Sequence, residues 1–142
     1  MLRVLIADDH AIVRKGLRNI LREAAQDALV GEASNGLEAL DLARAEPWDV
    51  VVLDITMPGA SGLEVLKQLK RDRPLMPVLM LSMHSGELYV NGSLKAGASG
   101  YLSKESAPEE LLTAIRAVLA GETYISQSLK DRRAGGPISL EE

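Results

Sequence analysis

The sequence predicts an α/β fold in which helices cover both faces of an open parallel sheet. Short apolar runs rich in β-branched residues recur along the chain, and each is followed by a stretch with helical apolar spacing. This alternation amounts to five βα units, the pattern of a doubly wound sheet. Polar residues suited to phosphate or metal chemistry follow several of these runs. The runs begin near Leu2, Ala28, Val50, Val78 and Gly100.

The five units correspond to a flavodoxin-like (βα)5 fold with a five-stranded sheet in the order 2-1-3-4-5. The first and last helices show the clearest apolar faces and are expected to cover the sheet. Those faces consist of Ile12, Val13, Leu17, Ile20 and Leu21 in the first helix, and of Leu111, Leu112, Ile115, Val118 and Leu119 in the last.

Capping-box spacing predicts three helix starts, at Asn35 with Glu38, at Ser61 with Glu64, and at Ser106 with Glu109. The fourth helix, from about residue 86 to residue 96, is expected to be short or mobile. It contains Asn91 and Gly92 in its middle, and a glycine there costs about 1 kcal/mol relative to alanine.

Residues 1–121 are expected to form one domain, with Gly121 as the C-terminal cap of its last helix. Residues 122–142 show no clear period and contain the flexible sequence Ala134–Pro137, so they are expected to form a linker. We expect this linker to lead, in a longer protein, to a further domain.

Composition excludes several classes of protein. The 142 residues include no cysteine, so disulfide frameworks and thiolate zinc sites are excluded. The first apolar run is too short for a signal peptide or a membrane span, which makes a soluble cytoplasmic protein the expectation. The net charge is -4, Lys and Arg are scattered, and only one Trp and three Tyr occur. This chain alone is therefore not expected to bind nucleic acid.

The residues that follow the predicted strands should meet at one crevice, because doubly wound sheets bind ligands at the carboxyl ends of their strands. In the predicted order the first and third strands are neighbours, so their acids crowd together and should raise at least one carboxyl pKa unless a cation compensates. Oxygen ligands favour Mg²⁺. The crevice residues are Asp8, Asp9, Asp54, Ser82 and Lys104.

Beside a divalent cation, Asp54 is a candidate nucleophile toward phosphorus, and Lys104 is the candidate counter-charge. Ser82 can donate a hydrogen bond to a phosphoryl oxygen, and the Thr56 carbonyl can bind the metal. Simpler interpretations exist for each residue taken alone. Asp9 is a suitable cap for the first helix and Asp54 a suitable turn former, and we interpret His10 and His84 as bystanders rather than ligands or phosphocarriers.

Four sequence motifs together carry a family resemblance. They are ADDH at residues 7–10, LDITMPGASGLEVL at 53–66, LSMHS at 81–85 and KAGASGYLSKES at 95–106. In this order and spacing the chain resembles the receiver domain of bacterial two-component response regulators, and it is most similar to the NarL/FixJ-like (LuxR-type) subfamily. The resemblance covers roughly Leu2 to Gly121.

The resemblance implies that Asp54 is the phosphoacceptor and that Mg²⁺ is held by Asp8, Asp9, Asp54 and the Thr56 carbonyl. It implies that Lys104 contacts the phosphate, that Ser82 and Tyr101 are the switch residues, and that Met83 and His84 influence phosphate lifetime. Glu105 stands where many receivers carry proline.

The partners implied are a sensor histidine kinase, a second copy of the chain, and DNA only through a helix-turn-helix domain that this chain does not contain. No membrane partner is expected. The chain would catalyse only its own phosphorylation and dephosphorylation. Two other functions stay open: a small Mg²⁺-dependent aspartyl-phosphate phosphatase of the haloacid-dehalogenase type, which would need an acid where Thr56 stands, and a phosphate-independent binding module.

Overall fold

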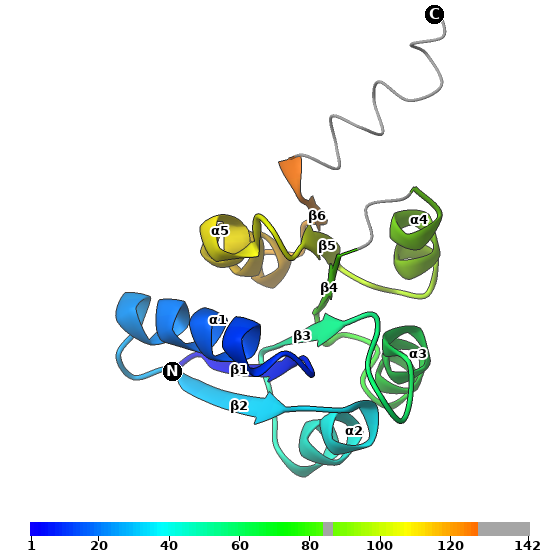
Figure 1. Cartoon of the computed structure of the whole chain (residues 1–142), viewed down its shortest axis with the longest axis horizontal. Coiled ribbons are helices and arrows are strands. Elements are labelled where there is room, and N and C mark those ends of the chain that lie inside the picture. The colour runs from blue at the N-terminus through cyan, green and yellow to red at the C-terminus, as the bar shows by residue number, and fades with distance from the viewer. Residues whose placement is uncertain (84–86, 128–142) are drawn as a thin grey trace, which may run out of the picture.

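Strands and helices alternate through the computed structural model of the chain, which describes residues 1–83 and 87–127 (Figure 1). The elements are β1 (Arg3–Ala7), α1 (Ala11–Ala24), β2 (Leu29–Ala33), α2 (Gly36–Ala45), β3 (Val50–Asp54), α3 (Gly62–Asp72), β4 (Val78–Ser82), α4 (Glu87–Lys95), β5 (Gly100–Ser103), α5 (Ala107–Leu119) and β6 (Tyr124–Ile125).

All strands pair in parallel, in the order β2-β1-β3-β4-β5-β6. The predicted fold class and the order 2-1-3-4-5 are therefore confirmed. The sheet has one strand more than predicted, because β6 adds to the outer edge of β5.

Helices α1 and α5 cover one face of the sheet, and α2, α3 and α4 cover the other (Figure 1). Alternate residues of β1 show why both faces are apolar: Val4 and Ile6 pack with α1 and α5, whereas Leu5 and Ala7 pack toward the opposite helices. The central strands are buried on both sides, which leaves only their ends for chemistry.

The predicted apolar faces of α1 and α5 are confirmed at their centres and wrong at their ends. Leu17 and Leu21 of α1 are buried, but Ile12 is 89% exposed. In α5, Ile115 is buried while Leu119 is 47% exposed. Ile12 and Leu119 lie to the side of the buried stripe, because their neighbours Val13 and Val118 are the residues of these turns that pack against the core.

All three predicted helix starts are confirmed, since α2, α3 and α5 directly follow Asn35, Ser61 and Ser106. The Asn35 and Ser61 side chains accept the backbone N–H groups of residues 38 and 64, respectively. Ser106 makes no such side-chain cap hydrogen bond, and its backbone is already helical. Asp9 is not a cap either, since His10 occupies the N-cap position of α1. Helix α4 has nine residues, so its predicted shortness is confirmed.

The end of α5 shows why the chain returns to the sheet. Gly121 has a φ of 86°, a conformation that favours glycine. Its N–H bonds the Val118 carbonyl, and the Glu122 N–H bonds the Ala117 carbonyl. These two bonds form a Schellman motif, so the predicted cap is confirmed. The motif turns the chain toward β5, and the packed structure continues past residue 121 into β6.

A polar network holds this last segment in place; we call it the Glu110 network, consisting of Ser103, Ser106, Glu110, Tyr124 and Ser126. The buried Ser126 hydroxyl donates to Glu110 Oε1, and the Gln127 N–H donates to Oε2 at 3.0 Å. The Ser103 N–H in turn donates to Ser126 Oγ at 3.1 Å. Residues of β5, α5 and the segment after β6 are therefore joined through one carboxylate.

The Glu110 carboxyl has a shifted pKa. Burial raises this pKa, but hydrogen bonds from Ser126, Gln127, Ser106 and Tyr124 outweigh burial and hold it below its usual value. A depressed carboxyl pKa adds stability above the ordinary pKa, and this stability is lost as pH falls through the folded-state pKa.

We predict that Glu110→Gln lowers the free energy of unfolding at pH 7 by about 1.5–3 kcal/mol, the range for hydrogen bonds to a charged group. The deficit should shrink at pH values below the pKa of the carboxyl. Urea unfolding at pH 7 and at a pH below the pKa of the carboxyl measures this deficit, with Glu109→Gln in the same helical turn as the matched control. Equal effects of the two substitutions would contradict this role for Glu110.

Gly62, at the start of α3, lies against the strand end that carries Asp54. A Cβ atom there would sit 2.2 Å from the Asp54 carbonyl oxygen, whereas one at Gly16 in α1 would meet nothing within 4 Å. We predict that Gly62→Ala destabilises the protein by about 1–3 kcal/mol through overpacking. Gly16→Ala should stabilise it by about 0.5–1 kcal/mol. Thermal or urea unfolding of both variants tests this contrast, and a harmless Gly62→Ala would refute the close approach.

Candidate functional site

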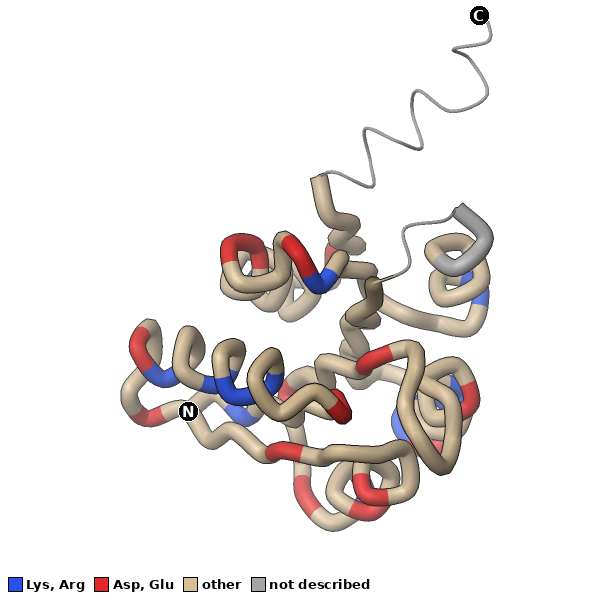
Figure 2. The backbone as a smooth tube through the Cα atoms, in the orientation of Figure 1, with Lys and Arg blue, Asp and Glu red and all other residues tan. Residues whose placement is uncertain are grey.

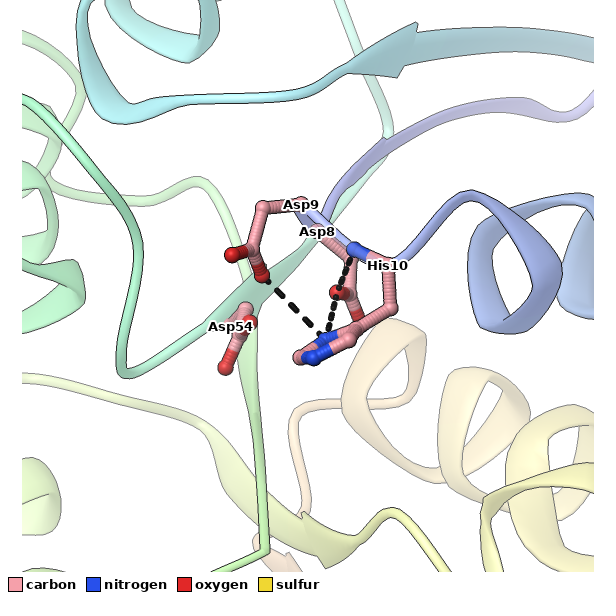
Figure 3. A group of neighbouring side chains, drawn as sticks. All are labelled: Asp8, Asp9, His10 and Asp54. Atoms are coloured by element: carbon pink, nitrogen blue, oxygen red, sulfur yellow. Dashed lines mark hydrogen bonds and ion pairs between the residues drawn. The ribbon is translucent and has the colours of Figure 1, made fainter.

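The predicted crevice lies at the carboxyl ends of β1, β3 and β5. Asp8 and Asp9 follow β1, Asp54 is the last residue of β3, and Lys104 follows β5. Figure 3 shows the side chains of Asp8, Asp9, His10 and Asp54 gathered at this edge. One ligand atom from each of these four residues lies within 4.8 Å of the others. The register of β1 with β3, which pairs Ala7 with Leu53, brings the acids together.

Asp8 is fully buried and fixed from several sides. Its carboxylate Oδ1 accepts the backbone N–H of His10 at 2.7 Å and a hydrogen bond from Lys104 at 3.2 Å. Its Oδ2 lies 3.1 Å from the Lys104 ammonium but accepts no hydrogen bond. This buried oxygen therefore keeps lone pairs available for a cation.

Lys104 provides the charge that these acids need. Its side chain is 5% exposed, and its Nζ lies 3.1 Å from Asp54 Oδ2 as well as contacting Asp8. The same Nζ is 2.9 Å from His10 Nδ1. The backbone N–H of Lys104 donates to the Ser82 carbonyl, which ties β5 to the end of β4. The structure thus places Lys104 where a counter-charge was predicted.

The pKa of Asp54 is raised to about 6, mainly because burial disfavours the charged carboxylate. The Thr56 N–H, which donates to Asp54 Oδ1 at 3.1 Å, and the Lys104 ammonium oppose this rise, while the charge of Asp8 adds to it. The raised carboxyl pKa agrees with the prediction in direction, but burial is its main cause and the crowding by Asp8 contributes less.

The other predicted site residues are placed as follows. Ser82 ends β4, is buried, and pairs in register with Ser103. Met83 is 72% exposed and, with Thr56, helps to line a pocket of about 300 Å³ over the acids. Tyr101 is fully buried among the residues that face α2, α3 and α4. His84 lies outside the described residues.

Sequence reasoning missed two residues of this site. His10 was interpreted as a bystander, yet its Nδ1 lies 3.1 Å from Asp8 Oδ1 and 3.2 Å from Asp9 Oδ1 (Figure 3). Arg14, among the basic residues along α1 (Figure 2), donates to the Asp8 carbonyl at 2.7 Å and to Glu32 at 2.8 Å. The one available signal was the spacing of four residues, which puts Arg14 one helical turn after His10.

The donor set fits a hard divalent cation. The donors are three carboxylates, of which Asp8 and Asp54 are buried and Asp9 is partly exposed. Oδ2 of the Asp8 carboxylate accepts no hydrogen bond. Oxygen donors of this kind favour an ion such as Mg²⁺. The arrangement is thus able to hold a cation beside a carboxylate of raised pKa and a buried lysine. The bond between Lys104 and Glu105, at the position where many receivers carry proline, is trans.

Comparisons with known proteins agree on one family. The profile of the response regulator receiver domain matches residues 4–116. The chain is 39% identical over 141 residues to response regulator UvrY of Escherichia coli K12, covering 99% of this chain and 65% of UvrY. It is 41% identical over 134 residues to the transcriptional activator protein ExaE of Pseudomonas putida, covering 94% of this chain and 63% of ExaE.

Solved structures give the same result. A LuxR-family two-component response regulator from Aurantimonas sp. SI85-9A1 superposes with a TM-score of 0.88 at 36% identity, covering 99% of this chain and 98% of that one. A CheY-like receiver domain protein from Methanospirillum hungatei JF-1 superposes with a TM-score of 0.79 at 28% identity, over 85% and 95% of the two chains. The chain thus spans about 65% of the length of its curated relatives and nearly all of the first of these structures.

We predict that Asp54→Asn stabilises the metal-free protein. A raised carboxyl pKa means that the stability present at low pH is lost as pH rises through about 6, because the charged group must then stay buried. The variant should gain about 1–3 kcal/mol at pH 7.5 over the wild type and nothing below about pH 4. Urea unfolding at both pH values measures this, with Asp41→Asn on the exposed side of α2 as control. A variant less stable than wild type at pH 7.5 would contradict the sign.

Proposed function

Because the chain belongs to the family of response regulator receiver domains, we propose that it is the phosphorylation-dependent switch of a two-component regulator, with Asp54 as phosphoacceptor. The observation that carries this proposal is the position of Asp54. Its carboxylate is 2% exposed, lines the pocket over the acids, and touches a buried lysine ammonium.

The proposed reaction is transfer of a phosphoryl group to Asp54. A carboxylate oxygen attacks phosphorus and forms the new O–P bond, while the bond from phosphorus to the kinase histidine nitrogen, or to the oxygen of an acyl phosphate, breaks and its electron pair leaves with the donor. The Thr56 N–H fixes one carboxylate oxygen and Lys104 neutralises the other. Both contacts orient the nucleophile before the donor arrives.

Asp8, Asp9, Asp54 and the Thr56 carbonyl would hold Mg²⁺, which when bound neutralises charge on the phosphoryl oxygens. Support for this comes from the buried Asp8 oxygen without a hydrogen bond. Lys104 would shift its contact from the Asp54 carboxylate to the phosphoryl group, since the ammonium already lies at that oxygen. Met83, at the mouth of the pocket, and His84 are proposed to influence how readily water reaches the phosphoryl group.

The conformational response is proposed to start at Ser82, whose carbonyl is bonded to Lys104. A hydrogen bond from the Ser82 hydroxyl to the phosphoryl group would draw the end of β4 toward the site. Tyr101 is fully buried in this structure, and this inward position of its ring is the one that we propose phosphorylation favours. Phosphorylation would then shift the equilibrium toward the conformation in which the Tyr101 ring is inside. The size of this shift is limited by the difference between the contacts that the phosphoryl group makes in the two conformations.

The output is proposed to be the control of transcription. We propose phosphorylation by a sensor histidine kinase in the cytoplasm, altered pairing of two copies, and transcription control through a DNA-binding domain outside this chain. Two relatives named as a response regulator and a transcriptional activator support this role. None of the helices in residues 1–83 and 87–127 is long and apolar enough to cross a bilayer.

We predict that acetyl phosphate with Mg²⁺ adds one phosphoryl mass to the wild-type chain and none to Asp54→Asn. Intact-mass spectrometry measures the addition, and Asp41→Asn serves as the matched control because it removes an exposed carboxylate far from the crevice. The control should label like the wild type. Equal labelling of Asp54→Asn would contradict the assignment of the phosphoacceptor. Turnover of an external phosphate ester would instead indicate a phosphatase.

A further inference from the structure

His10 is the one nitrogen ligand among the four residues grouped at this edge in the described part of the chain. Its backbone N–H donates to Asp8 Oδ1 at 2.7 Å, which fixes the residue beside the carboxylate. Its ring Nδ1 then lies 3.1 Å from Asp8 Oδ1 and 3.2 Å from Asp9 Oδ1. The imidazole therefore faces the acids and not only solvent, although its side chain is 60% exposed.

The ring nitrogen that faces the crevice contacts both kinds of charge. His10 Nδ1 lies 2.9 Å from the Lys104 ammonium as well as near the two carboxylates, so it can accept from the lysine or donate to an acid according to its tautomer. Possible ligand atoms from Asp8, Asp9 and His10 thus converge. The lysine ammonium is the cation that compensates them in this structure.

The spacing of these atoms fits coordination of one ion. Two ligand atoms bound at about 2.1 Å lie about 3.0 Å apart at neighbouring corners of an octahedron and about 3.4 Å apart in a tetrahedron. The observed separations of 3.1 and 3.2 Å fall between these values. The buried Asp8 Oδ2, which accepts no hydrogen bond, is a further donor beside them.

We infer that His10 Nδ1 is a direct metal ligand in this site and that it makes the site prefer first-row transition-metal dications such as Zn²⁺ and Mn²⁺ over Mg²⁺. Imidazole nitrogen suits zinc and its neighbours, whereas Mg²⁺ takes oxygen ligands. The inference rests on the metal site of the proposed function. In that scheme Lys104 moves to the phosphoryl group, which frees the histidine lone pair for the ion.

Isothermal titration of the wild-type chain with MgCl₂, MnCl₂ and ZnCl₂ tests this inference. Zn²⁺ should bind more tightly than Mg²⁺, and His10→Ala should weaken Zn²⁺ binding by more than about tenfold, the lower end of what loss of even an outer-shell partner costs. The same variant should weaken Mg²⁺ binding much less than it weakens Zn²⁺ binding, whereas Asp9→Asn should weaken the binding of both ions to a similar extent. In the wild type, nitrogen NMR should show the His10 Nδ1 resonance shifting on addition of Zn²⁺.

Each contrary result has a distinct meaning. Unchanged Zn²⁺ affinity in His10→Ala, or loss of Zn²⁺ binding in His84→Ala instead, overturns the assignment to His10 while leaving the Mg²⁺ site intact. Absence of Mg²⁺ binding by the wild type contradicts the metal site of the proposed function itself. An Nδ1 resonance unmoved by Zn²⁺ overturns the inference without reference to any variant.

Discussion

The buried ammonium of Lys104 is the interaction on which the rest of the site depends. A parallel sheet in this order places the ends of β1 and β3 side by side, and the sequence puts Asp8 and Asp54 there, both nearly without solvent. Two such carboxylates repel each other unless a cation lies between them. Lys104 reaches both at 3.1 Å from the end of β5. The compensation is incomplete, since the pKa of Asp54 stays raised to about 6. A site balanced in this way can exchange its internal cation for a metal ion and a phosphoryl group.

Strand and helix periodicity was sufficient to predict most of this architecture. The central strands are buried on both faces and form continuous apolar runs in the sequence, and all three helix starts predicted from capping-box spacing are present. The sixth strand was missed because it has only two residues and therefore no period. The structure shows that it lies close against Gly100, where a Cβ would stand 2.3 Å from the Tyr124 carbonyl oxygen. Helix α5 starts after Ser106 as predicted, but the Ser106 hydroxyl takes part in the Glu110 network and makes no cap hydrogen bond.

The acids and the lysine were predictable because a charge at the end of an apolar strand is conspicuous in a sequence. The roles of His10 and Arg14 depend instead on contacts through space. Arg14 fixes the carbonyl of Asp8, and His10 turns its ring back over the crevice from the N-cap of α1. Neither contact follows from residue type. Ser103, which directly precedes Lys104, is a similar case, since its backbone N–H donates to the hydroxyl of Ser126 beyond β6. Lys104, the proposed phosphate contact, thus directly follows the β5 residue that is bonded to the segment after β6.

Beryllofluoride, which mimics a phosphoryl group, tests the central claim most directly. Amide NMR spectra of the chain would be compared before and after its addition with Mg²⁺. A phosphorylation switch at Asp54 should give large shifts at Asp54, Ser82 and Lys104 that extend through Ser103 to Ser126 and are absent in Asp54→Asn. Spectra that do not change at Asp54, or that change equally in the Asp54→Asn variant, would contradict it.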